Sequence, residues 1–208
     1  MTTTNLAAEE LGAVEVAGMS RSSFLMKSAL TVGAVYGTAA VGPFVGKALA
    51  QEGGGDVEIL NFALTLEYLE ADFYAQAQKL ELEPDVAKLA KLFGDQEAEH
   101  ATALADTVTQ LGGTPAERPT FTFPMKDQAS FLKLAQTLED TGVSAYNGAG
   151  PQVEAPEVLA AAGSIVQIEG RHAAAIRLLN EDNPAPNAFD ETLEMKAVLD
   201  AVQPFIKA

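Results

Sequence analysis

The two histidines of this sequence stand in the same local pattern, three residues after a glutamate. One pair is Glu97 and His100, and the other is Glu169 and His172. Residues three apart on an α-helix project from one face, so each pair can offer a carboxylate and an imidazole to the same ligand. These oxygen and nitrogen donors suit iron or manganese. Each pair is therefore a candidate half of a metal site.

The pattern around the histidines is repeated along the chain. Glu67 precedes Glu97 by 30 positions, and Glu139 precedes Glu169 by the same 30, so the two halves are related by an offset of 72. The offset also aligns other residues: Ala63-Leu64-Thr65-Leu66 with Ala135-Gln136-Thr137-Leu138, Tyr74 with Tyr146, and Ala101 with Ala173. The sequence predicts two helical hairpins built on one plan.

The candidate ligands interrupt apolar stripes of helical period. On one expected helix the stripe consists of Val86, Ala90, Phe93, Glu97, His100 and Leu104, and the other three helices repeat the pattern. A stripe of this kind faces the core of a bundle. Because every candidate lies near the middle of its helix, we expect all of them to meet at one depth.

Four carboxylates in an apolar interior would lose hydration at a cost of several kcal/mol per ion, so something positive has to lie among them. Two divalent cations would balance the four negative charges. We therefore predict two metal ions, Fe or Mn, as cofactors. The predicted ligands are Glu67, Glu97, His100, Glu139, Glu169 and His172. The alternative is a metal-free bundle in which these polar residues satisfy one another.

Three nearby residues are assigned lesser roles. Tyr74 and Tyr146 are interpreted as core tyrosines with hydrogen-bonded hydroxyls rather than redox participants. Glu70 lies one turn beyond Glu67 and competes with it for the ligand role, but its counterpart at the offset of 72 is Gly142. The repeat therefore selects Glu67.

The elements that position these residues are predicted to be helices. Period and breaks give helices over 56–81, 85–111, 127–147 and 157–179, and a terminal helix over 190–206. Asp56, Asp85, Asp127 and Asp190 stand at expected N-caps. Residues 113–126 contain three prolines and are predicted to be an extended crossover. Fully extended, this segment would be about 46 Å long, and the preceding helix is about 40 Å long, so the crossover can run the full length of the bundle. The fold class is all-α: a four-helix bundle in which helices 85–111 and 127–147 can run parallel.

The composition excludes cysteine-dependent sites and argues against binding to nucleic acid. The chain has 208 residues and no cysteine, which excludes disulfides and thiolate-bound metals. It carries 13 Lys and Arg against 29 Asp and Glu, a formal net charge of −16. A phosphate backbone or an anionic lipid surface would repel such a body. Nucleic acid is therefore not an expected partner.

Residues 1–55 are predicted to be an export signal and a linker, and residues 56–208 the bundle. No charged residue occurs from Ala29 to Gly46, and Ala48-Leu49-Ala50 fits a signal-peptidase site. Upstream, 20–27 resembles a twin-arginine motif with Ser22 in place of the second arginine. Export to the periplasm or cell envelope is the expectation. The alternative is an uncleaved anchor, because an uncharged run of this length nearly suffices to cross a bilayer.

The stretch from Ile59 to Tyr74 resembles the ferritin-like domain proteins of the bacterial desiccation-related group, which are often exported. The likeness covers about 56–180 and includes both Glu-x-x-His motifs. It implies a ferritin-like bundle in which Glu97 and Glu169 bridge two near-equivalent metals. Glu67, Glu139, His100 and His172 would then be terminal ligands.

The wider ferritin-like superfamily includes ferroxidases, rubrerythrin-type peroxidases and manganese catalases, so the resemblance implies peroxide or oxygen as a partner and a role in stress protection. The cysteine iron site of rubrerythrins and a methionine haem ligand of bacterioferritins are missing here. We expect a dimetal oxidoreductase of the cell envelope. The alternatives are a structural or interaction module tethered through residues 1–50 to a membrane or larger assembly, and metal storage in a homo-oligomeric cage.

Overall fold

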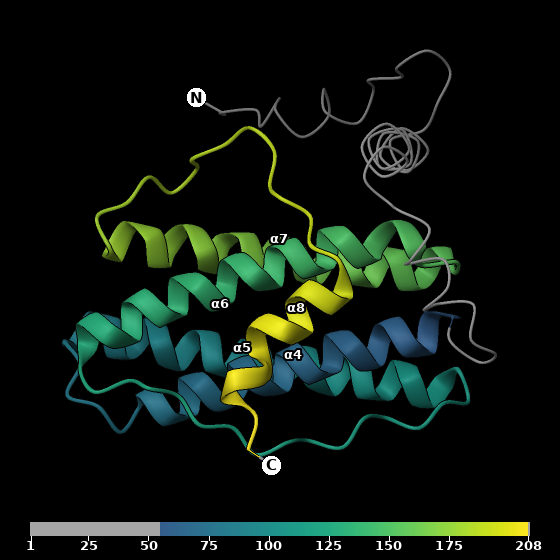
Figure 1. Cartoon of the computed structure of the whole chain (residues 1–208), viewed down its shortest axis with the longest axis horizontal. Helices are drawn as coiled ribbons and strands as arrows, with labels where there is room; N and C mark the ends of the chain where they lie inside the picture. Colours follow the sequence, from purple (N-terminus) through teal and green to yellow (C-terminus); the bar gives the residue numbers. More distant parts are fainter. Residues whose placement is uncertain (1–54, 208) are drawn as a thin grey trace, which may run out of the picture. The chain divides into compact units, whose positions relative to one another are not determined.

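Four long α-helices, one shorter α-helix and two short 3-10 helices (Gly150–Gln152 and Gln203–Phe205) are joined by loops in the described part of the chain. The computed structural model describes residues 55–207, so the predicted export or anchor segment lies outside the described residues. The helices are α4 (Gly55–Ala77), α5 (Pro84–Gln110), α6 (Gln128–Ala149), α7 (Pro156–Leu179) and α8 (Met195–Val202), shown in Figure 1. Within residues 55–207, the β-type pairing is one isolated bridge. The all-α prediction is confirmed.

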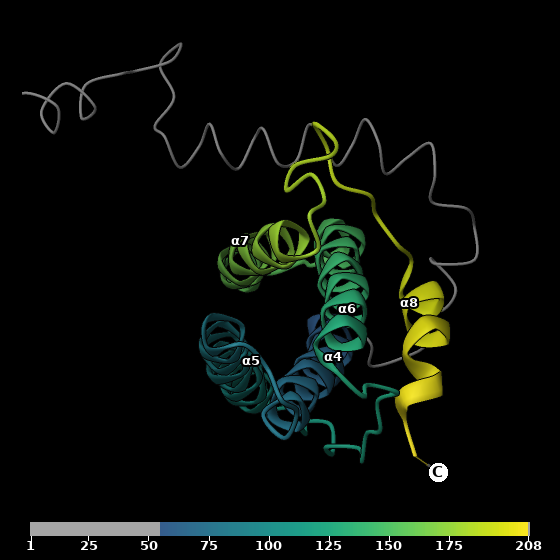
Figure 2. The same ribbon diagram turned by 90° about the vertical axis from the view of Figure 1, so that its left-hand side faces the viewer.

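The four long helices form a bundle of two hairpins, α4 with α5 and α6 with α7, seen end-on in Figure 2. At one end of the bundle, the backbone N–H of Glu83 donates to Gln128 Oε1 at 2.8 Å, which joins the starts of α5 and α6. At the other end, the Asp56 carboxylate accepts from the backbone N–H of Glu154 and of Ala155, which joins the starts of α4 and α7. Helices α5 and α6 therefore run parallel, and the crossover follows the length of the bundle (Figure 1).

The C-terminal segment ties the crossover to the bundle. Helix α8 lies outside the four-helix core and packs on α6 through the buried side chains of Val198 and Val202. Beyond it, Phe121 of the crossover pairs with Ile206 in an antiparallel bridge. Phe121 and Phe123 are both buried in the core. The crossover is thus anchored by its aromatic residues rather than by helical structure.

Two predicted helices are shorter than expected. Helix α4 ends at Ala77 rather than near 81, because the chain turns there and delivers Leu80 and Leu82 to the core as partly buried side chains. The terminal helix spans 195–202 rather than 190–206. The chain before it is held extended over α6, where the backbone N–H of Leu193 donates to Ser144 O at 3.0 Å. A Cβ added to Gly148 would lie 2.0 Å from the Leu193 carbonyl oxygen, so only glycine permits this approach.

One of the four expected N-caps has the predicted role. Asp127 caps α6, accepting from the backbone N–H of Ser130 in a reciprocal capping box. Helix α5 instead begins at Pro84, with Glu83 as its cap residue, because proline is well suited to the first helical position. Asp56 lies in the first turn of α4, and Asp190 lies upstream of α8.

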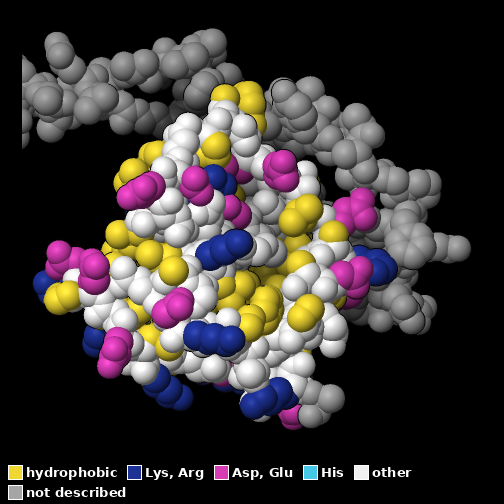
Figure 3. All heavy atoms as spheres, turned by 60° about the vertical axis from the view of Figure 1, so that its left-hand side comes forward, with side chains coloured by type: hydrophobic (Ala, Val, Ile, Leu, Met, Phe, Trp, Pro, Cys, Tyr) yellow, Lys and Arg dark blue, Asp and Glu magenta, His cyan; other side chains and the backbone are white. Residues whose placement is uncertain are grey.

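Apart from five buried glutamates, the Asp, Glu, Lys and Arg side chains of residues 55–207 are at least partly exposed. The face drawn in Figure 3 carries acidic and basic side chains of both signs, with hydrophobic side chains between them. Among the helices of residues 55–207, none is long and apolar enough to cross a membrane.

Candidate metal centre

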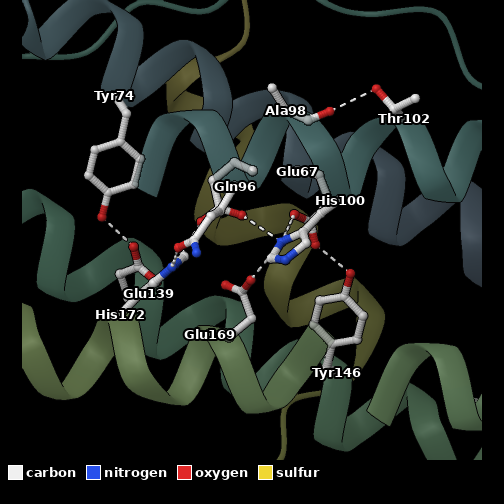
Figure 4. Close-up of polar contacts among 11 residues, drawn as sticks. Glu67, Tyr74, Gln96, Ala98, His100, Thr102, Glu139, Tyr146, Glu169 and His172 are labelled. Carbon is white, nitrogen blue, oxygen red and sulfur yellow. Dashed lines mark hydrogen bonds and ion pairs between the residues drawn. The ribbon is translucent and has the colours of Figure 1, made fainter. Parts of the chain in front are cut away.

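The six predicted ligands converge at the middle of the bundle, as Figure 4 shows for five of them. Each of the four long helices contributes: Glu67 from α4, Glu97 and His100 from α5, Glu139 from α6, and Glu169 and His172 from α7. The four glutamates and His172 are at most 1% exposed. The side chain of His100 is 13% exposed, so this residue lies at the edge of the cluster that is nearer to solvent.

The six side chains form two overlapping sets of donors, and within each set the donor atoms lie within 4.8 Å of one another. The His100 group consists of Glu67, Glu97, His100 and Glu169, and the His172 group of Glu97, Glu139, Glu169 and His172. Only Glu97 and Glu169 belong to both groups. These are the two residues to which the family resemblance assigns bridging roles, which stay a prediction.

Glu97 spans the two groups through its two oxygens. Its Oε1 lies 2.7 Å from Nδ1 of His172, and its Oε2 lies 3.0 Å from Nδ1 of His100. Nδ1 of His100 is also 3.2 Å from Glu67 Oε2 and 3.2 Å from Glu169 Oε1. One imidazole nitrogen from each histidine therefore points into the carboxylate cluster.

Several of these donor atoms are buried and make no well-directed hydrogen bond. They are Glu97 Oε1, Glu139 Oε2, both carboxylate oxygens of Glu169, and Nδ1 of His172. An unsatisfied buried polar atom is costly, and a protein normally avoids it. Here the atoms belong to predicted ligands of the two groups, and the contacts that most of them make are histidine–carboxylate ion pairs, such as the 2.7 Å between Glu97 Oε1 and Nδ1 of His172. The residues therefore fit a pair of metal ions, which would use these lone pairs; ligation itself stays a prediction.

Burial and mutual repulsion oppose ionisation of most carboxyls in the cluster. Burial raises the pKa of Glu67 to about 8, although His100 acts in the opposite direction. Burial and neighbouring carboxylates raise the pKa of Glu169 well above its usual range, and burial also raises that of Glu139. Glu97 differs: burial opposes its ionisation, but the close contacts with His100 and His172 outweigh burial and lower its pKa to about 2.

Both histidines hold a proton strongly in the absence of metal. Burial by itself would lower their pKa values, but the surrounding carboxylates outweigh burial. Contacts with Glu169, Glu67 and Glu97 raise the pKa of His100 to about 12. Contacts with Glu139 and Glu97 raise the pKa of His172 to about 10. Without metal, protons therefore supply the positive charge that the buried carboxylates need, and a metal ion has to displace them.

Two tyrosines donate hydrogen bonds to buried carboxylates across the bundle. The Tyr74 hydroxyl on α4 donates to Glu139 Oε1 on α6, and the Tyr146 hydroxyl on α6 donates to Glu67 Oε1 on α4. The internal repeat relates these two contacts to each other. The interpretation of both residues as core tyrosines with hydrogen-bonded hydroxyls agrees with these contacts.

Replacing each tyrosine by phenylalanine is expected to weaken one metal position selectively. Tyr146→Phe removes the donor to Glu67 and should lower metal affinity at the His100 group by about tenfold, the effect typical of losing a ligand's hydrogen-bond partner. Tyr74→Phe should do the same at the His172 group through Glu139. Calorimetric metal titration of the two variants measures both affinities. Equal weakening of both positions by either variant would contradict the assignment.

Two further contacts of His172 were not predicted from the sequence. Its Nε2 lies 2.8 Å from Gln96 Oε1, and because an amide oxygen only accepts, Nε2–H is the donor. Nδ1 is then the nitrogen left to bind metal when the ring is neutral. Phe93 stacks on the imidazole with a centroid distance of 3.8 Å. The repeat could not reveal Gln96, because its counterpart at the offset of 72 is Ile168.

Glu70 is a fifth buried carboxylate beside the cluster, although the repeat assigns it no role. It is 3% exposed, and burial followed by repulsion from Glu169 raises its pKa well above the usual range. A Cβ at Gly142 would lie 3.2 Å from Glu70 Oε1 and 3.3 Å from Glu169 Oε2. The absence of a side chain at position 142 thus leaves the room that Glu70 uses. Glu70 lies outside both donor groups, and it makes the two halves of the site unequal.

Comparisons with known proteins agree with the fold. The sequence profile of the ferritin-like domain family matches residues 55–182. No protein with a curated description matches the chain.

Two solved structures share the fold. One is a conserved hypothetical protein from Mycobacterium tuberculosis, 20% identical, with a TM-score of 0.57; the match covers 62% of this chain and 99% of that one. The other belongs to the ferritin-like, diiron-carboxylate proteins from Bacillus anthracis strain Ames, 22% identical, with a TM-score of 0.55; the match covers 59% of this chain and 93% of that one. The family profile spans more than half of the sequence and contains all six predicted ligands, and so this chain belongs to the ferritin-like domain family.

Proposed function

We propose that this protein is a dimetal-carboxylate oxidoreductase of the cell envelope, which binds two Fe or Mn ions and acts on dioxygen or peroxide or oxidises Fe(II). The observation that carries the proposal is that two four-residue donor groups share Glu97 and Glu169 at the centre of the bundle. Shared carboxylates hold two cations side by side and can neutralise both. A redox-active metal pair supplies two-electron chemistry on an O–O bond when it is bound.

The protein residues have defined tasks in this proposal. Glu97 and Glu169 hold the two positions together, and Gln96 fixes the ring nitrogen that His172 presents. Tyr74 and Tyr146 keep the terminal carboxylates in place by donating to one oxygen of each. Burial of the cluster excludes bulk water, which strengthens every charge interaction within it. No side-chain nucleophile is required.

The proposal predicts metal-dependent turnover. Purified protein loaded with Fe(II) or Mn(II) should consume peroxide or oxidise further Fe(II), and Glu97→Ala and His172→Ala should each lower the rate at least about 100-fold, because each removes a predicted ligand. Elemental analysis of the same samples gives the metal content. Two metal ions per chain without turnover would contradict the oxidoreductase and support a module in which the metals only stabilise the fold.

Export is the part of the proposal that rests on the sequence of residues 1–55 alone. The prediction is that the mature protein begins at Gln51, directly after the Ala-x-Ala sequence. N-terminal sequencing of the protein isolated from its native cell measures this. A protein that keeps Met1 and fractionates with membranes would instead support the uncleaved anchor.

A further inference from the structure

An apolar cavity lies at the end of the bundle where α4 and α7 begin and α6 ends. Its volume is about 20 Å³, counted as the space open to the centre of a water-sized sphere, which is room for one small molecule, and its surface is almost entirely hydrocarbon. The residues that matter for its shape are Ile59, Ala63, Leu104, Ala145, Tyr146 and Ala162. Tyr146 is the only residue with a polar side-chain atom among those that line it.

The cavity adjoins one of the two donor groups. Tyr146 lines it, and the hydroxyl of the same side chain donates to Glu67, a member of the His100 group (Figure 4). Ala63 and Leu104, which also line it, lie four residues from Glu67 and His100 on the same helices. The side chain of Tyr146 therefore reaches from the apolar space to the His100 group.

The internal repeat provides a comparison, because aromatic side chains stand at two of the equivalent positions beside the His172 group. The counterpart of Ala145 is Phe73, and that of Ile59 is Phe131. These two rings stack with a centroid distance of 5.3 Å, and Phe73 also meets Tyr74, the counterpart of Tyr146, at 5.2 Å. The cavity thus lies where alanine and isoleucine stand at the positions that two aromatic rings occupy in the other half of the repeat. The two rings occupy the corresponding positions beside the His172 group, so the two halves of the bundle differ in the apolar packing next to their donor groups.

We propose that this cavity is a binding site for dioxygen, which supplies the oxidant to the His100 group past Tyr146. The inference rests on the proposed function and selects dioxygen over peroxide as the oxidant that enters here. Dioxygen is small and apolar and loses no hydrogen bonds on entering a hydrocarbon space. Hydrogen peroxide would leave its hydrogen bonds to water without finding replacements. In the overall reaction, two Fe(II) ions lose one electron each, and dioxygen gains two electrons and two protons and leaves as hydrogen peroxide.

The first experiment tests the cavity without any metal or turnover. Xenon occupies dry apolar cavities in proteins, so crystals of the full chain held under xenon should show a xenon atom between Ala63, Ala145 and Tyr146. Crystals of Ala145→Phe, which places the ring of the other half of the repeat in the cavity, should show none. Absence of xenon from the unaltered protein would overturn the proposal while leaving the proposed metal chemistry intact.

The second experiment compares the two oxidants. Ala145→Phe should raise the KM for dioxygen in Fe(II) oxidation by about tenfold, the scale on which a hydrophobic pocket discriminates by size, and leave the rate with hydrogen peroxide unchanged. Ala63→Val is a milder filling of the same space, should Ala145→Phe fail to fold. Leu178→Phe, on an exposed position of α7, is the matched control and should alter neither.

The outcomes separate the two claims. An equal loss with both oxidants in the cavity variants would mean that the metal site itself is damaged, and it would contradict a role in dioxygen entry. An unchanged KM for dioxygen in both variants would contradict it as well. Failure of the unaltered protein to turn over either oxidant would overturn the proposed function, and the dioxygen site with it, whatever the xenon result.

Discussion

Replacing Glu97 by glutamine is expected to remove both metal ions at once. Its Oε1 faces Nδ1 of His172 at 2.7 Å and its Oε2 faces Nδ1 of His100 at 3.0 Å, so each oxygen serves one donor group. Glutamine keeps the size of the side chain but replaces one oxygen by an amide nitrogen that has no lone pair to offer. The remaining charges can no longer balance two divalent ions. We expect the affinity at both positions to fall by about 100-fold or more.

The controls for this prediction lie on the same bundle. Glu99→Gln makes the same chemical change two residues away on the exposed side of α5 and should keep both ions. Glu67→Gln affects a member of one group only and should lower the metal content towards one ion per chain. Elemental analysis after dialysis measures all three variants. A Glu97→Gln protein that retains one ion with unchanged affinity would show that Glu97 is not shared.

The second large effect is on stability. Two ions, each present at about 100 times its Kd, would stabilise the folded state by about 2.7 kcal/mol apiece. For a domain of this size that corresponds to a rise in Tm of about 10–20 °C. Calorimetry of metal-loaded and metal-free protein measures the difference. The Glu97→Gln variant is the control and should show almost no metal-dependent rise.

The stabilisation by metal should grow with pH. In the metal-free protein the pKa of Glu67 is raised from 4.5 to about 8, and those of His172 and His100 from 6.5 to about 10 and 12. The folded state thus holds protons that the unfolded chain has already released, so these groups stabilise it most at low pH. That contribution is lost as pH rises from about 4.5 through 8 and beyond. Metal takes the place of these protons, and a gap in Tm that stays constant between about pH 5.5 and 8.5 would contradict proton displacement.

The fold was predictable because the polar ligands and the apolar stripes share one helical period. The core side of α5 can be read from Val86, Ala90 and Phe93, and the breaks at prolines and glycines set the ends of most elements to within a few residues. The terminal helix was placed too long because its start is decided by tertiary contact. Leu193 is held by a backbone hydrogen bond to Ser144 on α6, and no local sequence signal records that contact.

The candidate site was predictable as far as the repeat extends and no further. Positions that match at the offset of 72, such as Glu97 with Glu169, come together in the structure. Some features occur in only one half of the repeat. Aligning the two halves could not reveal them, because they have no counterpart at the offset of 72. Gln96 holds His172 without a counterpart, and Glu70 uses the room above Gly142. The positions of such residues beside the site follow from tertiary packing, which the repeat does not record.

The central claim is that two metal ions lie between the four helices and share Glu97 and Glu169. Anomalous diffraction from crystals of the full chain soaked in Fe(II) or Mn(II), recorded at the absorption edge of the metal, tests it directly. We predict two peaks, one within the His100 group and one within the His172 group, both in contact with the two shared carboxylates. A single peak outside these groups, or a cluster without any peak under saturating metal, would contradict the account.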